Sequence, residues 1–106
     1  MGKHNPCEGI NIERLSAIYS NTTYTGNGSN RVGSTTVTLT FILSDGSTTD
    51  KTETFSGIKE TTTGCFNYVI CYWNVTVMVT VTVTGVNNNM QITGAIGDIV
   101  SIDAIE

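Results

Sequence analysis

Charged side chains are scarce in this sequence. Only 13 % of its 106 residues are Asp, Glu, Lys or Arg, about half the usual share for a soluble domain. The five basic residues are scattered and the net charge is −4, so no basic stripe is available to follow a phosphate backbone. The composition therefore argues against nucleic acid as a partner.

Histidine is nearly absent, because His4 is the only one. A histidine-based triad would have to recruit this side chain from the N-terminal end, and three cysteines with one histidine make a poor zinc site. Asp45, Asp98 and Asp103 lie in or near expected turns, but no turn has the alternating acidic spacing of a calcium loop. We therefore expect no catalytic residues, no metal and no cofactor, and we expect that the protein is not an enzyme.

Long apolar runs are also missing. Residues 1–10, MGKHNPCEGI, lack the continuous apolar stretch of a signal peptide. The run 75–83 is interrupted by threonine and is too short to cross a bilayer as a helix. We expect a chain that is made in the cytoplasm without a signal peptide and is not inserted into a membrane.

Threonine and glycine are abundant instead. The chain has nineteen threonines, eleven glycines and one proline, a composition typical of strands joined by short turns. The clearest strand covers 75–83, where valine occupies every odd position and threonine or methionine the even ones. This period of two predicts a half-buried β-strand.

The segment before this strand has the opposite alternation. Its apolar residues Phe66, Tyr68, Ile70 and Tyr72 occupy even positions, and one strand over 65–85 would be roughly 70 Å long. The change of face predicts a bulge, corner or tight turn at Trp73-Asn74.

A hairpin is expected earlier in the chain. Residues 35–43 alternate threonine with apolar residues, and Asp45-Gly46 favours a tight turn with positive φ. The return segment 48–55 is polar on both faces, which suits an edge strand.

The remaining segments complete an all-β chain. We expect a bulged strand over 10–20, although one helical face also fits, then a loop or a loose edge over 21–34 and a loop over 56–64. A turn at 87–89, a strand from 90 to 93, a turn or bulge over 94–98 and a last strand over 99–105 follow. Six to eight short strands predict one antiparallel β-sandwich or jelly-roll domain over 10–106.

Residues 1–9 have no periodic apolar residue and cannot pack as a core element. They are either a disordered tail or, as we expect, a connector arm that docks on another subunit. The arm comprises Lys3, His4, Asn5, Pro6 and Cys7, of which Cys7 is the distinctive group.

Three cysteines leave one over after any pairing within the chain. Cys65 and Cys71 share a face about 20 Å apart in a continuous strand, too far for a mutual bond. Each is therefore a candidate for Cys7 of a neighbouring subunit, in a head-to-tail contact that would propagate. The alternative is three buried, reduced cysteines.

A sugar platform is a further possibility, because Tyr19, Tyr24, Tyr68, Tyr72 and Trp73 could present their rings. Most of these residues fall in or beside strand patterns, where aromatic side chains fill a core. We therefore give carbohydrate binding second place.

The order of these segments resembles the subunits of bacterial endospore appendages, which are pilus-like fibres. The likeness lies in the arm MGKHNPC, then LSAIYSNTTYTG, then TTVTLTFILSDG, then valine- and threonine-rich strands with further cysteines. Those subunits are small, leaderless jelly rolls with a cysteine-bearing N-terminal connector. The resemblance implies that Cys7 cross-links neighbouring subunits and that Cys65 or Cys71 receives the bond.

Together these features predict a self-assembling structural subunit of a spore-surface or extracellular fibre. Its partners would be copies of itself, joined by β-augmentation, arm insertion and intersubunit disulfides. The alternative is a carbohydrate-binding or phage decoration module without catalytic activity.

Overall fold

The computed structural model describes residues 7–105, which form six β-strands and two short 3-10 helices. The strands are β1 (Ile12–Thr25), β2 (Val32–Leu43), β3 (Thr48–Ile58), β4 (Thr62–Ile70), β5 (Trp73–Thr84) and β6 (Gln91–Ala104), and the helices are η1 (Gly28–Asn30) and η2 (Asn87–Asn89). The strands pair antiparallel in two three-stranded sheets, ordered β1-β2-β3 and β4-β5-β6. The prediction of an all-β fold with at least six strands is confirmed.

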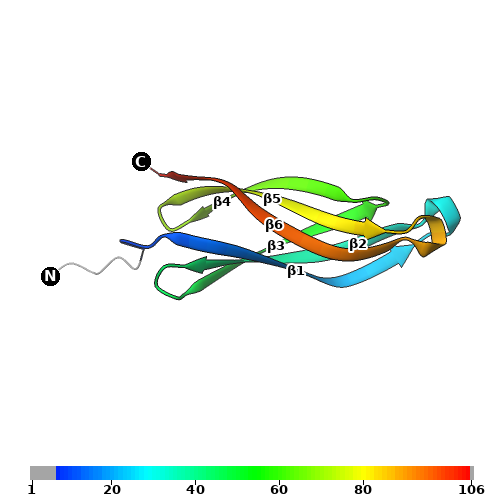
Figure 1. The fold of residues 1–106 in the computed structure, drawn as a ribbon, viewed down its shortest axis with the longest axis horizontal. Helices are drawn as coiled ribbons and strands as arrows, with labels where there is room; N and C mark the ends of the chain where they lie inside the picture. The colour runs from blue at the N-terminus through cyan, green and yellow to red at the C-terminus, as the bar shows by residue number, and fades with distance from the viewer. Residues whose placement is uncertain (1–6, 106) are drawn as a thin grey trace.

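The molecule is a rod of 65 × 21 × 16 Å, and its strands run along the long axis (Figure 1). β1 begins and β6 ends at one end of the rod, which we call the disulfide end (residues 7–11, 44–47, 71–72 and 105). The helices η1 and η2 lie at the opposite end, which we call the loop end (residues 26–31, 59–61 and 85–90).

Each sheet is a meander, because every strand pairs with its neighbour in sequence. A jelly roll requires Greek-key connections that carry the chain from one sheet to the other and back. Among residues 7–105 the chain passes between the sheets once, from β3 to β4. The fold is therefore sandwich-like, and the jelly-roll connectivity is not confirmed.

The core lies between the sheets and is built from alternate residues of the two central strands. Val37, Leu39 and Phe41 of β2 are fully buried, and so are the odd-numbered valines 75–81 of β5. Burying a valine, leucine or phenylalanine side chain stabilises the fold by about 1.5–3 kcal/mol relative to leaving it exposed. The period of two in the sequence thus becomes one apolar inner face and one threonine-rich outer face.

The sheets meet differently along their two long sides. On one side β1 and β6 lie next to each other (Figure 1). On the other side aromatic side chains join β3 to β4: the rings of Phe55 and Phe66 meet edge to face with centroids 5.9 Å apart, and the Tyr68 hydroxyl donates a 2.6 Å hydrogen bond to Glu53. Burial and this contact with the Glu53 carboxylate raise the pKa of Tyr68, so its hydroxyl stays protonated and remains a donor.

The β1–β2 and β5–β6 hairpins close with the same kind of turn. Each turn has a glycine at positive φ, Gly26 at 83° and Gly85 at 82°, followed by a 3-10 helix. At either position a Cβ atom would collide with the backbone carbonyl of Asn30 or Asn89. Only glycine therefore fits both the backbone angle and the space.

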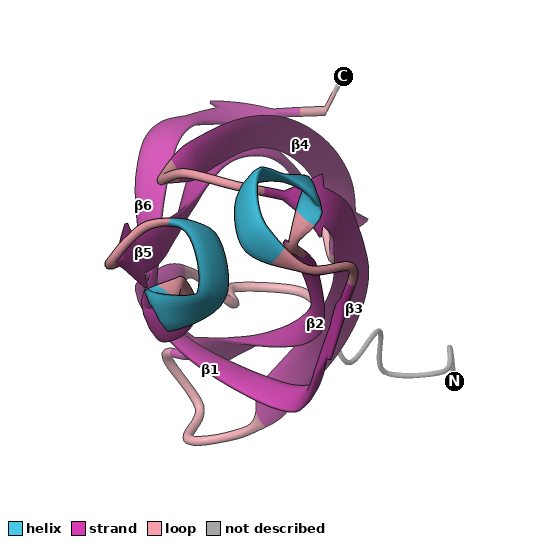
Figure 2. Ribbon diagram, turned by 90° about the vertical axis from the view of Figure 1, so that its right-hand side faces the viewer, coloured by secondary structure: helices cyan, strands magenta, loops and turns pink. Residues whose placement is uncertain are grey.

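The two turns also bind each other, and Figure 2 shows η1 and η2 side by side when the loop end faces the viewer. The Gly28 N–H donates to Asn88 Oδ1 (2.7 Å), and Arg31 Nε–H donates to the carbonyl of Met90 (3.1 Å). The Arg31 guanidinium also lies 4.2 Å from the ring centre of Tyr24. The loop end is thus closed by contacts between residues about sixty positions apart.

The segment 21–34, predicted as a loop or a loose edge, is mostly strand, and its first part belongs to the edge strand β1. β1 continues to Thr25 after an irregularity between Ser20 and Thr23, and β2 begins at Val32. The turn-forming residues fit a strand here because Tyr24 pairs opposite Gly33. Its hydroxyl also accepts a hydrogen bond from the Ile92 N–H (2.8 Å). The contact with Ile92 of the distant strand β6 therefore overrides the local preference of these residues for a turn.

The loop predicted over 56–64 is confined to residues 59–61. β3 continues through Gly57, at φ 65°, to Ile58, whose side chain is only 2 % exposed. β4 then begins at Thr62, so the connection is short. Gly57 suggests that the strand ends there, but Ile58 is buried opposite Gly33 and keeps the chain in the sheet.

The break in the central segment is confirmed as a tight turn, but its predicted position is wrong. Ile70 pairs with Trp73, so the turn consists of Cys71-Tyr72 and not Trp73-Asn74. Over 94–98 the structure has no turn: β6 is continuous, with pairing irregularities between 92 and 94 and between 99 and 101. The Asp45-Gly46 hairpin and the bulge near Ile12 are confirmed, although in this hairpin only Gly46 has positive φ.

Candidate functional site at the disulfide end

The most distinctive residue of the molecule is Cys71 in the β4–β5 turn. Its φ is 52°, a left-handed conformation that costs a residue with a side chain roughly 1–2 kcal/mol. Glycine or asparagine would fit this position with less strain. A cysteine here indicates that the thiol is needed at this place.

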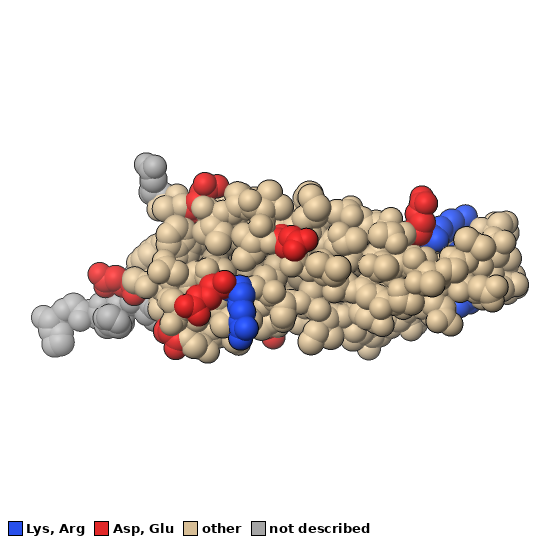
Figure 3. Space-filling view, viewed as in Figure 1, with Lys and Arg blue, Asp and Glu red and all other residues tan. Residues whose placement is uncertain are grey.

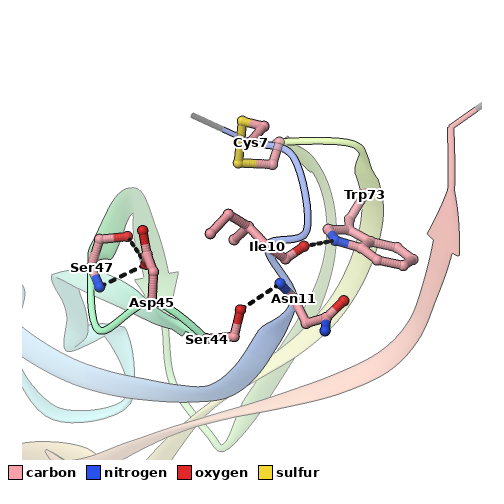
Figure 4. The surroundings of a disulfide bond; sticks show 8 residues. Cys7, Ile10, Asn11, Ser44, Asp45, Ser47 and Trp73 are labelled. Atoms are coloured by element: carbon pink, nitrogen blue, oxygen red, sulfur yellow. Dashed lines mark hydrogen bonds between the residues drawn. A yellow bond between two sulfur atoms is a disulfide. The ribbon is translucent and has the colours of Figure 1, made fainter. Parts of the chain in front are cut away.

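Cys71 forms a disulfide with Cys7, and the two Cα atoms are 5.0 Å apart (Figure 4). The bond joins residues separated by 64 positions. It fixes the start of the described chain to the outside of the β4–β5 turn.

Hydrogen bonds hold the segment that follows Cys7. The indole N–H of Trp73 donates to the carbonyl of Ile10 (2.7 Å), the Asn11 N–H donates to Ser44 Oγ (2.9 Å), and the Ser44 N–H donates back to the carbonyl of Asn11 (2.8 Å) (Figure 4). Residues 7–11 are therefore docked against two turns of their own domain.

We expected the arm to dock on a neighbouring subunit and Cys7 to bond there. In this structure Cys7 bonds to Cys71 of the same chain, because the β4–β5 turn places Cys71 at the end of the rod where β1 begins. Lys3, His4, Asn5 and Pro6 lie outside the described residues.

Cys65 is the free cysteine of the described chain, and its side chain is exposed on β4. It pairs opposite Met78, which is 38 % exposed. As expected, Cys65 and Cys71 do not bond to each other. The alternative of three buried, reduced cysteines does not hold.

Acidic side chains outnumber basic ones towards the disulfide end. Glu8, Glu13, Asp45, Asp50 and Asp103 lie towards this end together with Arg14 and Lys51, whereas Arg31 and Lys59 lie at the loop end beside Glu60. Figure 3 shows acidic and basic side chains near both ends of one face. At the disulfide end, the Ser47 hydroxyl and N–H donate to Asp45 Oδ1 and lower the pKa of its carboxyl group. Among the described residues the excess of acidic side chains therefore lies towards the disulfide end.

The five aromatic candidates for a sugar platform are dispersed. Tyr24, Tyr68 and Trp73 are half-buried, and each makes a hydrogen bond inside the molecule. Tyr19 and Tyr72 are 37 % and 47 % exposed, on β1 and in the β4–β5 turn. Residues 7–105 do not bring these rings onto one surface.

Sequence reasoning missed the partners of the N-terminal segment. Ser44 and Asn11 carry no signal, because serine and asparagine are common in turns. Trp73 does carry a signal, because the indole N–H of a tryptophan in an apolar strand needs a hydrogen-bond acceptor. That requirement pointed to a contact at this turn but could not say which carbonyl would make it.

No pocket and no group of three potential metal ligands occurs in the part of the chain that the structure describes. Residues 7–105 also include no helix that is long and apolar enough to span a bilayer. In comparisons with known proteins, no family model, curated protein or solved structure matches the chain.

Proposed function

We propose that the protein is a structural subunit that polymerises with copies of itself into an extracellular or spore-surface fibre. The observation that carries the proposal is the docking of residues 7–11. This segment belongs to neither sheet and is held at one end of the rod by a disulfide, a few hydrogen bonds and the packing of Ile10 against the core. A site of this kind can bind the same segment from a second copy, and exchange of an identical element is a low-cost route to assembly.

In such a fibre the Cys7–Cys71 bond forms between neighbouring subunits instead of within one chain. The receptor side of the joint is the β4–β5 turn, with Cys71 and Trp73, together with Ser44 of the β2–β3 turn. The same contacts then link one subunit covalently to the next. Cys65 is a second candidate for a bond between subunits, because its thiol is exposed.

The ends of the rod are too small to hold a fibre by themselves. A cross-section of 21 × 16 Å offers roughly 300 Å², whereas a stable interface buries about 800 Å² per partner. The long sides must therefore contribute. They offer the edge strand β3 for pairing with another sheet. The second sheet also exposes apolar side chains at Val69, Ile96 and Val100.

The alternative is a carbohydrate-binding or phage decoration module. A sugar platform would require neighbouring exposed rings, but Tyr19 lies on β1 roughly 20 Å along the rod from the disulfide end, where Tyr72 is. We therefore favour assembly and treat this module as an outcome of the test.

The test is negative-stain electron microscopy of the purified full-length chain, under oxidising conditions and again with reductant. We expect regular filaments that shorten when the disulfides are reduced. Non-reducing gel electrophoresis of the same samples should show a ladder of covalent multimers. Discrete particles and a single monomer band under both conditions would overturn the proposal and direct attention to glycan binding.

Variants identify the joint. Deletion of residues 1–9 and Cys7→Ser should each abolish the covalent ladder. Cys65→Ser is the matched control, because it removes a thiol of the same chain that lies outside the docked segment. A ladder that survives Cys7→Ser but is lost in Cys65→Ser would assign the covalent joint to Cys65.

A further inference from the structure

The sequence contains a single Asn-Gly pair, Asn27-Gly28, and it lies at the tip of the loop end. Asn27 precedes η1 with extended backbone angles (φ −128°, ψ 151°), and its side chain makes no capping hydrogen bond. The side chain is also exposed. Its amide carbon is therefore open to attack from the following residue.

An asparagine followed by glycine can lose its side-chain amide without any co-reactant except water. The backbone nitrogen of Gly28 gives up its proton to solvent and bonds to Cγ of Asn27. The Cγ–Nδ2 bond breaks and ammonia leaves, which closes a five-membered succinimide. Water then opens the ring to aspartate or isoaspartate. Glycine favours this step because no Cβ atom hinders the approach of its nitrogen.

The structure holds this nitrogen in place through a residue far away in sequence. The Gly28 N–H donates a 2.7 Å hydrogen bond to Asn88 Oδ1 of η2. While this bond is made, Gly28 keeps its proton and its nitrogen stays directed at the second turn. We propose that Asn27-Gly28 is a deamidation site and that Asn88 sets the rate of its modification.

The other position with a comparable sequence is Asp45-Gly46, and it is protected differently. Asp45 Oδ1 accepts hydrogen bonds from the Ser47 N–H and hydroxyl, which hold the side chain in place. The Gly46 N–H in turn donates to the carbonyl of Leu43 (3.0 Å). Both reacting groups are therefore engaged at Asp45-Gly46, whereas only the nitrogen is engaged at Asn27-Gly28.

Modification would change the loop end alone. It places a new negative charge near Arg31 and Lys59, and Lys59 already donates to the carbonyl of Ser29 (3.1 Å). Isoaspartate also adds a carbon to the backbone between Gly26 and η1, next to Gly26, where even a Cβ atom would meet the carbonyl of Asn30. We expect the contact between η1 and η2 to open, so that modified molecules differ from new ones at this end.

The experiment follows deamidation by mass spectrometry during incubation of the full-length protein at mildly alkaline pH. Trypsin releases residues 15–31 as one peptide, because Arg14 and Arg31 bound it, and fragmentation locates the modified asparagine. We expect slow conversion at Asn27 in the unaltered protein. Asn88→Ala should raise the rate roughly fivefold, the factor that corresponds to a net hydrogen bond of ~1 kcal/mol.

Two variants serve as controls for this result. Asn88→Asp keeps an acceptor oxygen and should leave the rate low. Asn89→Ala removes the neighbouring amide of the same turn and should change nothing. Hydrogen exchange should show that Asn88→Ala exposes the Gly28 amide while the core strands stay protected. Equal rates in the unaltered protein and Asn88→Ala, or modification mainly at Asn21 or Asn30, would overturn the proposal.

Discussion

The loop end closes with two turns of the same shape, each built on a glycine at positive φ and a 3-10 helix. The turns are joined by hydrogen bonds from Gly28 to Asn88 and from Arg31 to Met90. The disulfide end has no such repetition. It depends on one covalent bond across 64 positions, an indole donor and a serine. The loop end thus relies on two glycine turns and the contacts between them, and the disulfide end relies on a covalent bond. The two ends should therefore respond to different perturbations.

The largest effect should come from removing the disulfide. Closing a loop of this length restricts the unfolded chain by about 4 kcal/mol in the entropic account. Cys7→Ser, or reduction of the full chain, should therefore lower the free energy of unfolding by up to this amount. The measurement is chemical denaturation of monomeric protein. Cys65→Ser should leave the midpoint nearly unchanged, and an equal loss in both variants would show that the Cys7–Cys71 bond has no special role.

Breaking the loop end requires a change of backbone instead. Gly85→Ala places a Cβ atom against the carbonyl of Asn89 at a φ of 82°, so we expect a loss of roughly 2–3 kcal/mol. Gly46→Ala is the matched control at the disulfide end. It has a φ of 87° but open space around it, and should cost only about 1 kcal/mol. If thermal unfolding shows that Gly46→Ala loses more stability than Gly85→Ala, the collision with the Asn89 carbonyl is not the cause of the loss.

The smallest effect concerns pH at the disulfide end. The bonds from Ser47 lower the pKa of Asp45 in the folded state. Its contribution to stability is therefore present above the ordinary pKa of 3.8 and is lost as the pH falls through the folded value. Titration followed by NMR should show the Asp45 pKa rising towards its ordinary value in Ser47→Ala. An unchanged Asp45 titration in Ser47→Ala would show that Ser47 is not the cause.

Strand alternation predicted the centre of the molecule better than its connections. Residues 35–43 and 75–83 are strands because each valine, leucine or phenylalanine at every second position faces the same core. The errors fall at 21–34 and 56–64, where turn-forming residues suggest loops but pairing with β2 and β5 keeps most of the chain extended. Turn-forming residues allow the backbone to turn, but pairing with a neighbouring strand decides whether a turn forms.

The cysteine pairing shows the same limit at the candidate site. Spacing correctly separated Cys65 from Cys71 but could not decide where Cys7 would bond. That depended on a turn at Cys71-Tyr72, two residues before the predicted position. The parity change located the turn only approximately, because neither of its residues is a usual turn former.

The sequence by itself determined the all-β class, the two central strands, the Asp45-Gly46 hairpin and the turn at 87–89. These features follow from side-chain alternation and from residues that permit positive φ, both of which are local properties. Tertiary structure alone decided the meander order of the sheets, the docking of residues 7–11 and the hydrogen bond from Gly28 to Asn88. Each of these joins residues far apart in the chain, and their meeting depends on how the sheets pack.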